Sequence, residues 1–232
     1  MNFNPKIVTD GLILCLDAAD KKSYSGSGTT WYDRSGDNDN ATLAGGVGFS
    51  SNNGGALTFD GVDDKTSTAM DAFDLYCFEV AIKYGTQAHA TWVGIDIGSN
   101  SFNGITHGSW TGTMDDETIA WFGYASDNPS GSAGTYIKDT ISEGWHILTF
   151  NWNGTGYDIW LDGTKRTTYA RGGGSGASGL FEGVTEIYGA WNAGWTTAFM
   201  EGEIGFMRAY NNSLTDQQVL QNFNAMRGRF GV

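Results

Sequence analysis

The sequence predicts an all-β, antiparallel fold that ends in one short α-helix. Three observations lead to this prediction: apolar residues alternate with a period of two along most patterned segments, turn-forming residues separate those segments, and helical spacing is confined to the C-terminus. Glycine is unusually frequent, with 35 of 232 residues, about twice the average usage. Because glycine tolerates the backbone angles of tight turns, this excess fits a fold with many strands and turns.

The first predicted strand lies near the N-terminus. Its alternation places Leu12, Leu14 and Leu16 on one face. Cys15 lies in the same segment, and Cys77, the second of two cysteines, lies in another strand-like segment. Two cysteines in apolar strands do not make a disulfide framework, and buried cysteine behaves as a small apolar residue. We therefore expect both to be buried free thiols.

The longest strand pattern covers 144–152. A turn and a second strand-like segment, 157–161, follow it. The dipeptide Asp162-Gly163 comes next and suits the positive φ angles of a tight hairpin. We therefore predict successive antiparallel hairpins over 145–169.

One helix is predicted near the C-terminus. Thr215 can serve as its N-cap, and Gln218 three residues later completes a capping box. Arg227 and Arg229 lie near its end, where positive charge complements the helix dipole. Apolar residues recur at i, i+4 and i+7, which predicts one buried stripe: Val219, Phe223 and Met226.

The composition excludes several functional classes. Lys plus Arg is 13 and Asp plus Glu is 26, so the net charge is 13 − 26 = −13. This charge argues against nucleic acid or an anionic membrane as a partner, because such binding needs clustered lysine and arginine. No apolar run approaches the roughly 18 residues of a membrane span. With 40% hydrophobic residues, the chain is also too apolar for a disordered tail.

Five segments match the signatures of a known family, in the family's own order: 11–19, 31–36, 57–64, 144–163 and 202–214. They resemble the laminin-G-type jelly-roll modules of the concanavalin A-like lectin and glucanase superfamily. The resemblance implies an antiparallel jelly-roll β-sandwich over 11–213. It also implies an N-terminal arm over 1–10, and a C-terminal helix and tail over 214–232 packed on the sandwich.

A narrower resemblance lies in three end segments, 6–11, 27–31 and 221–230. They are similar to a version of this module that is common in structural proteins of tailed bacteriophages. This implies a non-enzymatic virion surface component, such as a capsid decoration or head fibre. Its partners would be other virion proteins, namely major capsid or fibre subunits, or further copies in a homo-oligomer. The N-terminus lacks a signal-peptide pattern, as expected for a part made in the host cytoplasm.

Catalysis is disfavoured. Related endo-glucanases carry Glu-x-Asp-x-x-Glu on one strand, which aims two carboxylates into the cleft. The nearest match here has Glu201 and Glu203 but Phe206 in place of the third acid. The three histidines are scattered without metal-ligand spacing, and His146 alternates with core-facing residues as a structural histidine would. We therefore expect no enzyme activity, and glycoside hydrolase is the least favoured alternative.

Calcium is the cofactor that the resemblance implies, because lectin-like jelly rolls often hold Ca²⁺ with loop carboxylates and backbone carbonyls. Hard cations take such oxygen ligands. The alternative is that the loop aspartates form turns and that their carboxylates accept hydrogen bonds from backbone N–H groups. The candidate ligands, all in matching or adjacent loops, are Asp33, Asp37, Asp39, Asp60, Asp63 and Asp64.

Surface glycans are the other predicted partner. Sugars stack on exposed aromatic rings while polar side chains hold their hydroxyls. Trp191, Asn192 and Trp195 lie in one Gly/Asn/Thr-rich segment, 191–197. His107 and Trp110 lie in a second candidate segment, 107–111. The alternative is that the tryptophans fill the sandwich core. A lectin-like carbohydrate-binding module or adhesin is therefore the alternative to a virion part, and the two are compatible on one particle.

Overall fold

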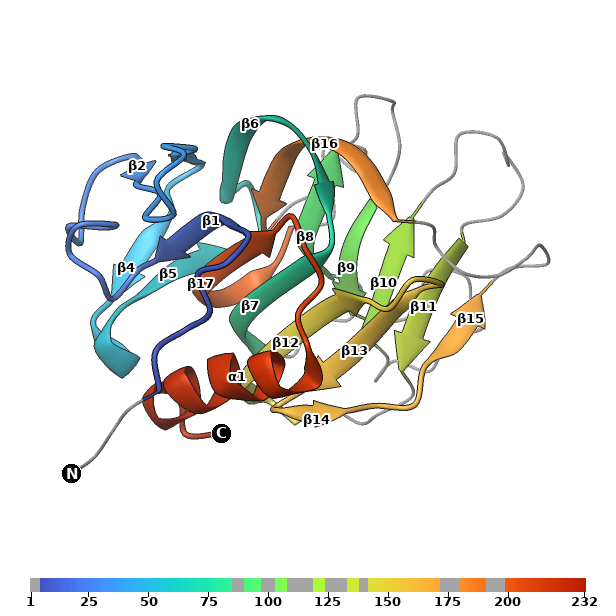
Figure 1. Ribbon diagram of the computed structural model, residues 1–232. Coiled ribbons are helices and arrows are strands. Elements are labelled where there is room, and N and C mark those ends of the chain that lie inside the picture. The colour runs from blue at the N-terminus through green and yellow to red at the C-terminus, as the bar shows by residue number, and fades with distance from the viewer. Residues whose placement is uncertain are drawn as a thin grey trace.

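The computed structural model describes residues 5–84, 90–96, 103–107, 119–123, 133–137, 142–171, 180–190 and 199–232. These residues form two antiparallel sheets and one C-terminal helix, so the all-β prediction is confirmed (Figure 1). No helix among them has the length and apolarity of a membrane span.

The first sheet has eight strands in the order β14-β13-β12-β7-β17-β5-β4, and β1 also pairs with β17. β17 thus occupies the centre and contacts β1, β5 and β7. The strands are β1 (Leu12–Asp17), β4 (Gly48–Ser50), β5 (Ala56–Asp60), β7 (Cys77–Tyr84), β12 (Gly144–Trp152), β13 (Tyr157–Leu161), β14 (Thr164–Lys165) and β17 (Glu201–Tyr210).

The second sheet has nine strands in the order β15-β11-β10-β9-β8-β16-β6-β3-β2. Since β3, β5 and β16 are followed in sequence by strands of the opposite sheet, the chain crosses repeatedly between the two layers. The strands are β2 (Thr30–Trp31), β3 (Ala41–Ala44), β6 (Lys65–Leu75), β8 (Ala90–Asp96), β9 (Asn103–His107), β10 (Ile119–Gly123), β11 (Ala133–Ile137), β15 (Tyr169–Arg171) and β16 (Phe181–Gly189).

The main core lies between the sheets, and the first sheet also has a covered outer face. On β7, the side chains of Phe78, Val80 and Ile82 belong to the main core. Cys77 and Ala81, which alternate with these residues, pack instead in two smaller clusters beneath the C-terminal helix. Strand alternation sends successive side chains to opposite faces, and both faces of β7 are buried. This explains why the strand is almost continuously apolar.

The helix α1 (Asp216–Phe230) lies across the outer side of the first sheet (Figure 1). The predicted capping box between Thr215 and Gln218 is present, and Gly231 ends the helix at φ 75°. The predicted apolar stripe faces the sheet and is confirmed: Val219, Phe223 and Met226.

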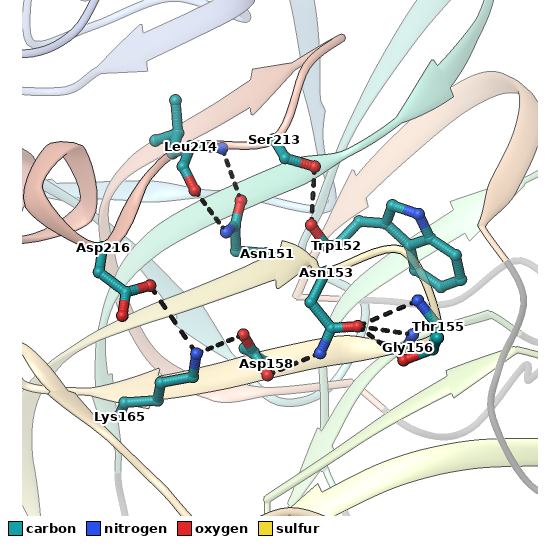
Figure 2. A network of polar contacts seen from close by, with 10 residues as sticks. All are labelled: Asn151, Trp152, Asn153, Thr155, Gly156, Asp158, Lys165, Ser213, Leu214 and Asp216. Atoms are coloured by element: carbon teal, nitrogen blue, oxygen red, sulfur yellow. Dashed lines mark hydrogen bonds and ion pairs between the residues drawn. The ribbon is translucent and has the colours of Figure 1, made fainter.

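Polar links fasten the start of α1 to the β12–β13 hairpin (Figure 2). The Asn151 amide donates to the Leu214 carbonyl at 2.7 Å and accepts from the Leu214 N–H at 2.8 Å. The Lys165 ammonium lies 2.6 Å from Asp158 and 3.7 Å from Asp216. The backbone of Leu214, just before α1, is therefore hydrogen-bonded through both its N–H and its C=O group to the side chain of Asn151.

The first strand differs from its prediction at one position. Leu14 and Leu16 are buried in the main core, whereas Leu12 packs against the cluster under α1. The prediction that all three leucines share a face is wrong, because the pairing with β17 shifts register between Leu12 and Leu14. Cys15 and Cys77 are buried free thiols, as predicted.

A second register shift lies in β17, between Ile204 and Phe206 relative to β7. Ile204 belongs to the main core, but Phe206 packs under α1. The intervening Gly205 has no side chain, and a Cβ there would lie 2.6 Å from the Phe230 ring. Glycine at this position thus lets the last turn of α1 rest directly on β17.

The predicted hairpins over 145–169 are confirmed for β12, β13 and β14. Asp162 and Gly163 have positive φ angles of 50° and 70°, as the turn requires. The prediction is wrong at its end, because Tyr169 begins β15, which pairs with β11 in the second sheet.

Candidate functional site

Strand ends in the second sheet align at one end of the sandwich. Gly189, the last residue of β16, pairs with Thr66 near the start of β6 and with Val93 of β8. Ala90, the first residue of β8, pairs with His107, the last residue of β9. The chain therefore leaves β9 and β16 at the end where β6 and β8 begin.

The first sheet contributes to the same end. Asp60, the last residue of β5, pairs with Glu201, the first residue of β17. The Met200 N–H donates to the Ala190 carbonyl at 2.9 Å, which closes the base of the connection between β16 and β17. We call this end the rim: it comprises the ends of β5, β9 and β16 and the starts of β6, β8 and β17.

The rim is formed by strand ends that are far apart in sequence. His107 ends β9, and only its backbone pairing is described. Trp110, Trp191, Asn192 and Trp195 lie outside the described residues. The glycan-contact prediction for these five residues therefore stays a prediction. The described strand ends on either side of their segments lie at the rim.

Three of the six predicted calcium ligands lie in the tight turn between β5 and β6, which we call the acid turn (residues 60–64). One carboxylate oxygen from each of Asp60, Asp63 and Asp64 lies within 4.8 Å of the others. The Asp60 carboxylate accepts from the Val62 N–H at 2.8 Å, and Gly61 has a φ of 77°. A hydrogen bond within the turn therefore occupies one carboxylate oxygen of Asp60, namely Oδ1.

Asp64 is the unusual member of the acid turn, because its side chain is buried with 3% of its surface exposed. Its Oδ2 accepts from the Asp60 N–H at 3.0 Å. Its Oδ1 is buried and has no hydrogen-bond partner among the described residues. Burial raises the pKa of the Asp64 carboxyl, and the nearby charges of Asp60 and Asp63 add to the rise.

The turn between β3 and β4 packs directly on the acid turn. Gly45 has a φ of 95°, and a Cβ there would lie 2.3 Å from the Asp63 carbonyl oxygen. A Cβ on Gly46 would lie 3.5 Å from Oδ1 of Asp64. The two glycines therefore let one turn cover the other, and they place the unpartnered oxygen against Gly46.

The other three predicted ligands, Asp33, Asp37 and Asp39, lie in a separate loop between β2 and β3. Both oxygens of Asp33 are already used: Oδ1 accepts from the N–H groups of Cys15 and Ser35, and Oδ2 accepts from the Ser35 hydroxyl and the Asn38 N–H. Asp33 thus acts as a backbone cap, which is the alternative considered for these acids. The structure does not bring this loop together with the acid turn.

A buried polar cluster beneath α1 was not among the sequence predictions. Glu79 and Arg208 are 1% and 2% exposed, and Arg208 Nη1 lies 3.7 Å from Glu79 Oε2. The Asn222 amide donates to Glu79 at 2.9 Å, and the Thr149 hydroxyl donates to Glu79 at 3.4 Å. Burial raises the pKa of Glu79, while Arg208 opposes the rise. The sequence signal that could have revealed this cluster is a charged residue within each of two apolar strands, Glu79 in β7 and Arg208 in β17.

His146 is a structural histidine, as predicted. Its Nδ1 lies 2.7 Å from Asp162 Oδ2 and its Nε2 lies 2.8 Å from the Ser142 carbonyl oxygen. Both partners are acceptors, so the ring is best satisfied when both nitrogens carry a proton. The pKa of His146 is raised because these hydrogen bonds outweigh the opposing effect of burial.

The strand segment nearest to the glucanase motif has a different arrangement from paired catalytic acids. Glu203 forms an ion pair with Lys83, with 2.7 Å between the ammonium and Oε1. Phe206, at the position of the third acid, is buried under α1 because of the register shift at Gly205. Glu201 begins β17 at the rim and pairs with Asp60 through the backbone.

No protein-family model and no curated protein matches the sequence. Among solved structures, domain 4 of AbnA, a GH43 extracellular arabinanase from Geobacillus stearothermophilus in complex with arabinotriose, superposes with a TM-score of 0.68. The identity is 16%, and the match covers 91% of this chain and 97% of that domain. The fold is an antiparallel jelly-roll β-sandwich.

Two longer chains contain the same fold. The binding domain of botulinum neurotoxin serotype D/C matches with a TM-score of 0.68 and 15% identity, over 94% of this chain and 53% of that one. Trypanosoma rangeli sialidase in complex with sialic acid matches with a TM-score of 0.62 and 12% identity, over 94% of this chain and 33% of that one. The chain thus spans about half and a third of these two proteins.

Proposed function

We propose that this chain is a non-catalytic binding module that recognises a surface carbohydrate at the rim. One observation carries the proposal: strand register gathers at one end the acid turn, the end of β9 at His107 and the closed base between Ala190 and Met200. Binding sites in rigid sandwiches are commonly built from connections at one end of the strands. The candidate aromatic residues belong to the segments that start from these strand ends.

The structural neighbours support a carbohydrate as the ligand. The domain of AbnA that matches over nearly its whole length was solved with arabinotriose, and the sialidase was solved with sialic acid. The botulinum match is described as a binding domain. A sugar site on this chain would use Trp191, Trp195 and Trp110 as stacking surfaces, with Asn192 and His107 as hydrogen-bonding groups.

A glycan array that includes arabinan oligosaccharides and sialylated glycans tests this proposal. The double variant Trp191→Ala/Trp195→Ala should lose binding by at least about tenfold, since buried aromatic anchors dominate such affinities. Tyr32→Ala is the matched control, because Tyr32 is a half-exposed aromatic residue outside the rim. Absence of binding to any glycan, or equal binding by the double variant, would contradict the proposal.

The absence of catalysis is part of the proposal. It is supported by the ion pair that engages Glu203 and by the burial of Phe206 where a third acid would be needed. Incubation of the chain with arabinan and with β-glucan should release no reducing sugar above the buffer control. Product release that is lost in a Glu201→Gln/Glu203→Gln variant would identify a glycosidase instead.

We further propose that the module works on the surface of a bacteriophage particle. The support is that two of the end segments similar to phage structural proteins contact each other. The Gln221 amide donates to the Lys6 carbonyl at 2.7 Å, and the Val8 N–H donates to Asn222 at 2.7 Å. Immunogold labelling of particles from a lysate should place the chain on virions, and light scattering should give a homo-oligomer. Unlabelled particles and a monomer would contradict this setting.

A further inference from the structure

The turn between β12 and β13 carries an exposed Asn-Gly dipeptide, Asn153-Gly154. Asparagine before glycine loses its side-chain amide more readily than asparagine before other residues, because glycine has no Cβ to hinder attack of its nitrogen on the asparagine Cγ. The chain contains two other such dipeptides, Asn53-Gly54 and Asn103-Gly104. The structure places the three in different surroundings.

The peptide that joins Asn153 to Gly154 is free to turn. Among the described residues, no group donates to the Asn153 carbonyl oxygen and none accepts from the Gly154 N–H. Gly154 has a φ of 97°, and nothing lies within 4 Å of a Cβ there. The turn itself is held, since the Asn153 N–H donates to the Gly156 carbonyl at 2.9 Å. The Gly154 nitrogen can therefore move toward the Asn153 side chain without breaking a backbone hydrogen bond.

The side chain of Asn153 is oriented for this attack (Figure 2). Its Oδ1 accepts from the Thr155 N–H at 3.0 Å, the Thr155 hydroxyl at 3.0 Å and the Gly156 N–H at 3.1 Å. Its Nδ2 donates to Asp158 Oδ1 at 2.8 Å. Negative charge develops on the amide oxygen when a nucleophile adds to Cγ, and three donors that already contact this oxygen stabilise that charge.

We propose that Asn153 is a modification site at which the chain deamidates itself through a succinimide. The Gly154 nitrogen loses its proton to solvent hydroxide and bonds to Cγ. The bond between Cγ and Nδ2 then breaks, and the amide nitrogen leaves as ammonia after taking a proton from water, which regenerates hydroxide. A water molecule opens the succinimide by adding OH to Cγ or to the Asn153 carbonyl carbon and a proton to the glycine nitrogen. The products are aspartate and isoaspartate, and the net co-reactant is water.

The other two dipeptides are held differently. Asn103-Gly104 lies within β9, where both residues pair with β8, so the peptide between them is fixed by the sheet. Asn53-Gly54 is exposed, but the Asn53 carbonyl oxygen accepts from Arg229 Nε at 2.6 Å, and Asn53 Nδ2 donates to the Arg229 carbonyl at 2.8 Å. Arg229 thus holds both the backbone and the side chain of Asn53. Asn53 is therefore the matched control within the same chain.

The modification changes the link between this turn and α1. A carboxylate in place of the Asn153 amide would face Asp158, whose Oδ2 lies 2.6 Å from the Lys165 ammonium. Lys165 also lies 3.7 Å from Asp216 at the start of α1, so one lysine would then face three acids. Isoaspartate would in addition lengthen the backbone of a tight turn. The modified chain should therefore have a Tm lower by roughly 2–4 °C.

Incubation of the full chain in warm, mildly alkaline buffer, followed by peptide mass spectrometry, tests the proposal without any sugar. The peptide that contains Asn153 should gain about 1 Da as its amide becomes an acid. A methyltransferase specific for isoaspartate should label the same peptide.

The chain unfolded in guanidinium chloride gives the intrinsic rate of each dipeptide. In the folded chain, Asn153 should convert at least about tenfold faster than Asn53, whereas the two should convert at similar rates when unfolded. Equal rates for Asn153 and Asn53 in the folded chain would overturn the proposal. So would an unmodified Asn153 in the folded chain after most of the unfolded sample has reacted.

Variants at Thr155 test the role of the donors. Thr155→Val removes the hydroxyl donor to Asn153 Oδ1, and it should slow conversion of the folded chain by about tenfold. Thr155→Ser keeps a hydroxyl and is the matched control, so its rate should stay within about twofold of the native rate. Both positions are exposed, so neither change disturbs the core. Equal rates for Thr155→Val and Thr155→Ser would overturn the assignment of Oδ1 as an activated oxygen.

Discussion

Glu79 and Asp64 are both buried acids whose pKa is raised by burial, yet they lie in contrasting surroundings. Beneath α1, Glu79 faces Arg208, and the Asn222 amide and Thr149 hydroxyl donate to its two oxygens. At the rim, Asp64 faces two further acids and has one oxygen without a donor. Both oxygens of Glu79 therefore have donors and an opposite charge nearby, whereas one oxygen of Asp64 has neither; Arg208 Nε and Nη1 are nevertheless also buried without a hydrogen-bond partner among the described residues.

The largest expected effect comes from breaking the buried pair of Glu79 and Arg208. Glu79→Ala leaves the Arg208 charge buried without its carboxylate, and it should lower the free energy of unfolding by about 3–5 kcal/mol. Urea denaturation monitored by fluorescence measures this loss. Glu182→Ala, on an exposed position of β16, should stay within about 0.5 kcal/mol of the native chain.

The double variant Glu79→Leu/Arg208→Met sharpens this test. It removes both charges together, so it should recover most of the stability that the single variant loses. A single-variant loss below about 1 kcal/mol would show that the pair is not the anchor of this face.

The next effect concerns the contact that shapes the rim. Gly45→Ala forces a side chain toward the Asp63 carbonyl at a positive φ, and it should lower the free energy of unfolding by about 2–4 kcal/mol. Gly28→Ala is the matched control: Gly28 has a similar positive φ, 99° against 95° for Gly45, but nothing lies within 4 Å of a Cβ there.

Gly28→Ala should therefore lose only the cost of the backbone angle, about 1–2 kcal/mol. Equal losses of stability in the two glycine variants would contradict a packed junction between the β3–β4 turn and the acid turn. Urea denaturation of both variants measures the two losses.

A smaller effect should appear on the α1 side as a pH dependence. The pKa of His146 is raised in the folded chain, so the folded state holds its proton more tightly than the unfolded state does. The resulting stabilisation is fully present below the unfolded pKa and is lost as pH rises through the folded pKa. Unfolding free energy should fall by about 1 kcal/mol between pH 6 and pH 9.

His146→Gln removes this titration and keeps a side chain that can hydrogen-bond. Its stability should therefore be flatter over the same pH range, with the loss already present at pH 6. An unchanged slope in His146→Gln would assign the pH dependence to another group.

The smallest expected effect concerns charge repulsion in the acid turn. In EDTA, Asp63→Asn relieves repulsion among neighbouring carboxylates, and it should raise the free energy of unfolding by about 0.5 kcal/mol. A variant that is less stable than the native chain in EDTA would show that Asp63 supports the turn rather than crowding it.

Local sequence patterns predicted much of the fold. The capping box of Thr215 and Gln218, the stripe led by Val219 and the hairpin at Asp162-Gly163 depend on residues within a few positions of one another. Such short-range preferences act whatever the rest of the chain does. The sequence likewise showed Phe206 at the place of the third acid of the glucanase motif, because that motif spans only six residues.

The register shifts could not be predicted in this way. Alternation alone placed Leu12 with Leu14, but their pairing with β17 separates them. Phe206 likewise leaves the face of Ile204 because Gly205 is opposed by the ring of Phe230, which lies at the far end of the chain. Shifts of this kind depend on strand partners that are distant in sequence.

By itself, the sequence determined the all-β class, several strands and the C-terminal helix, and it offered six acids as candidate ligands of a hard cation. Only the tertiary structure divided that set. Asp33 is satisfied by donors that include the N–H of Cys15, 18 residues away, whereas Asp64 is buried against Gly46 with an oxygen left unpartnered. The physical reason is that an aspartate's chemistry depends on which donors and charges the folded chain brings to its two oxygens.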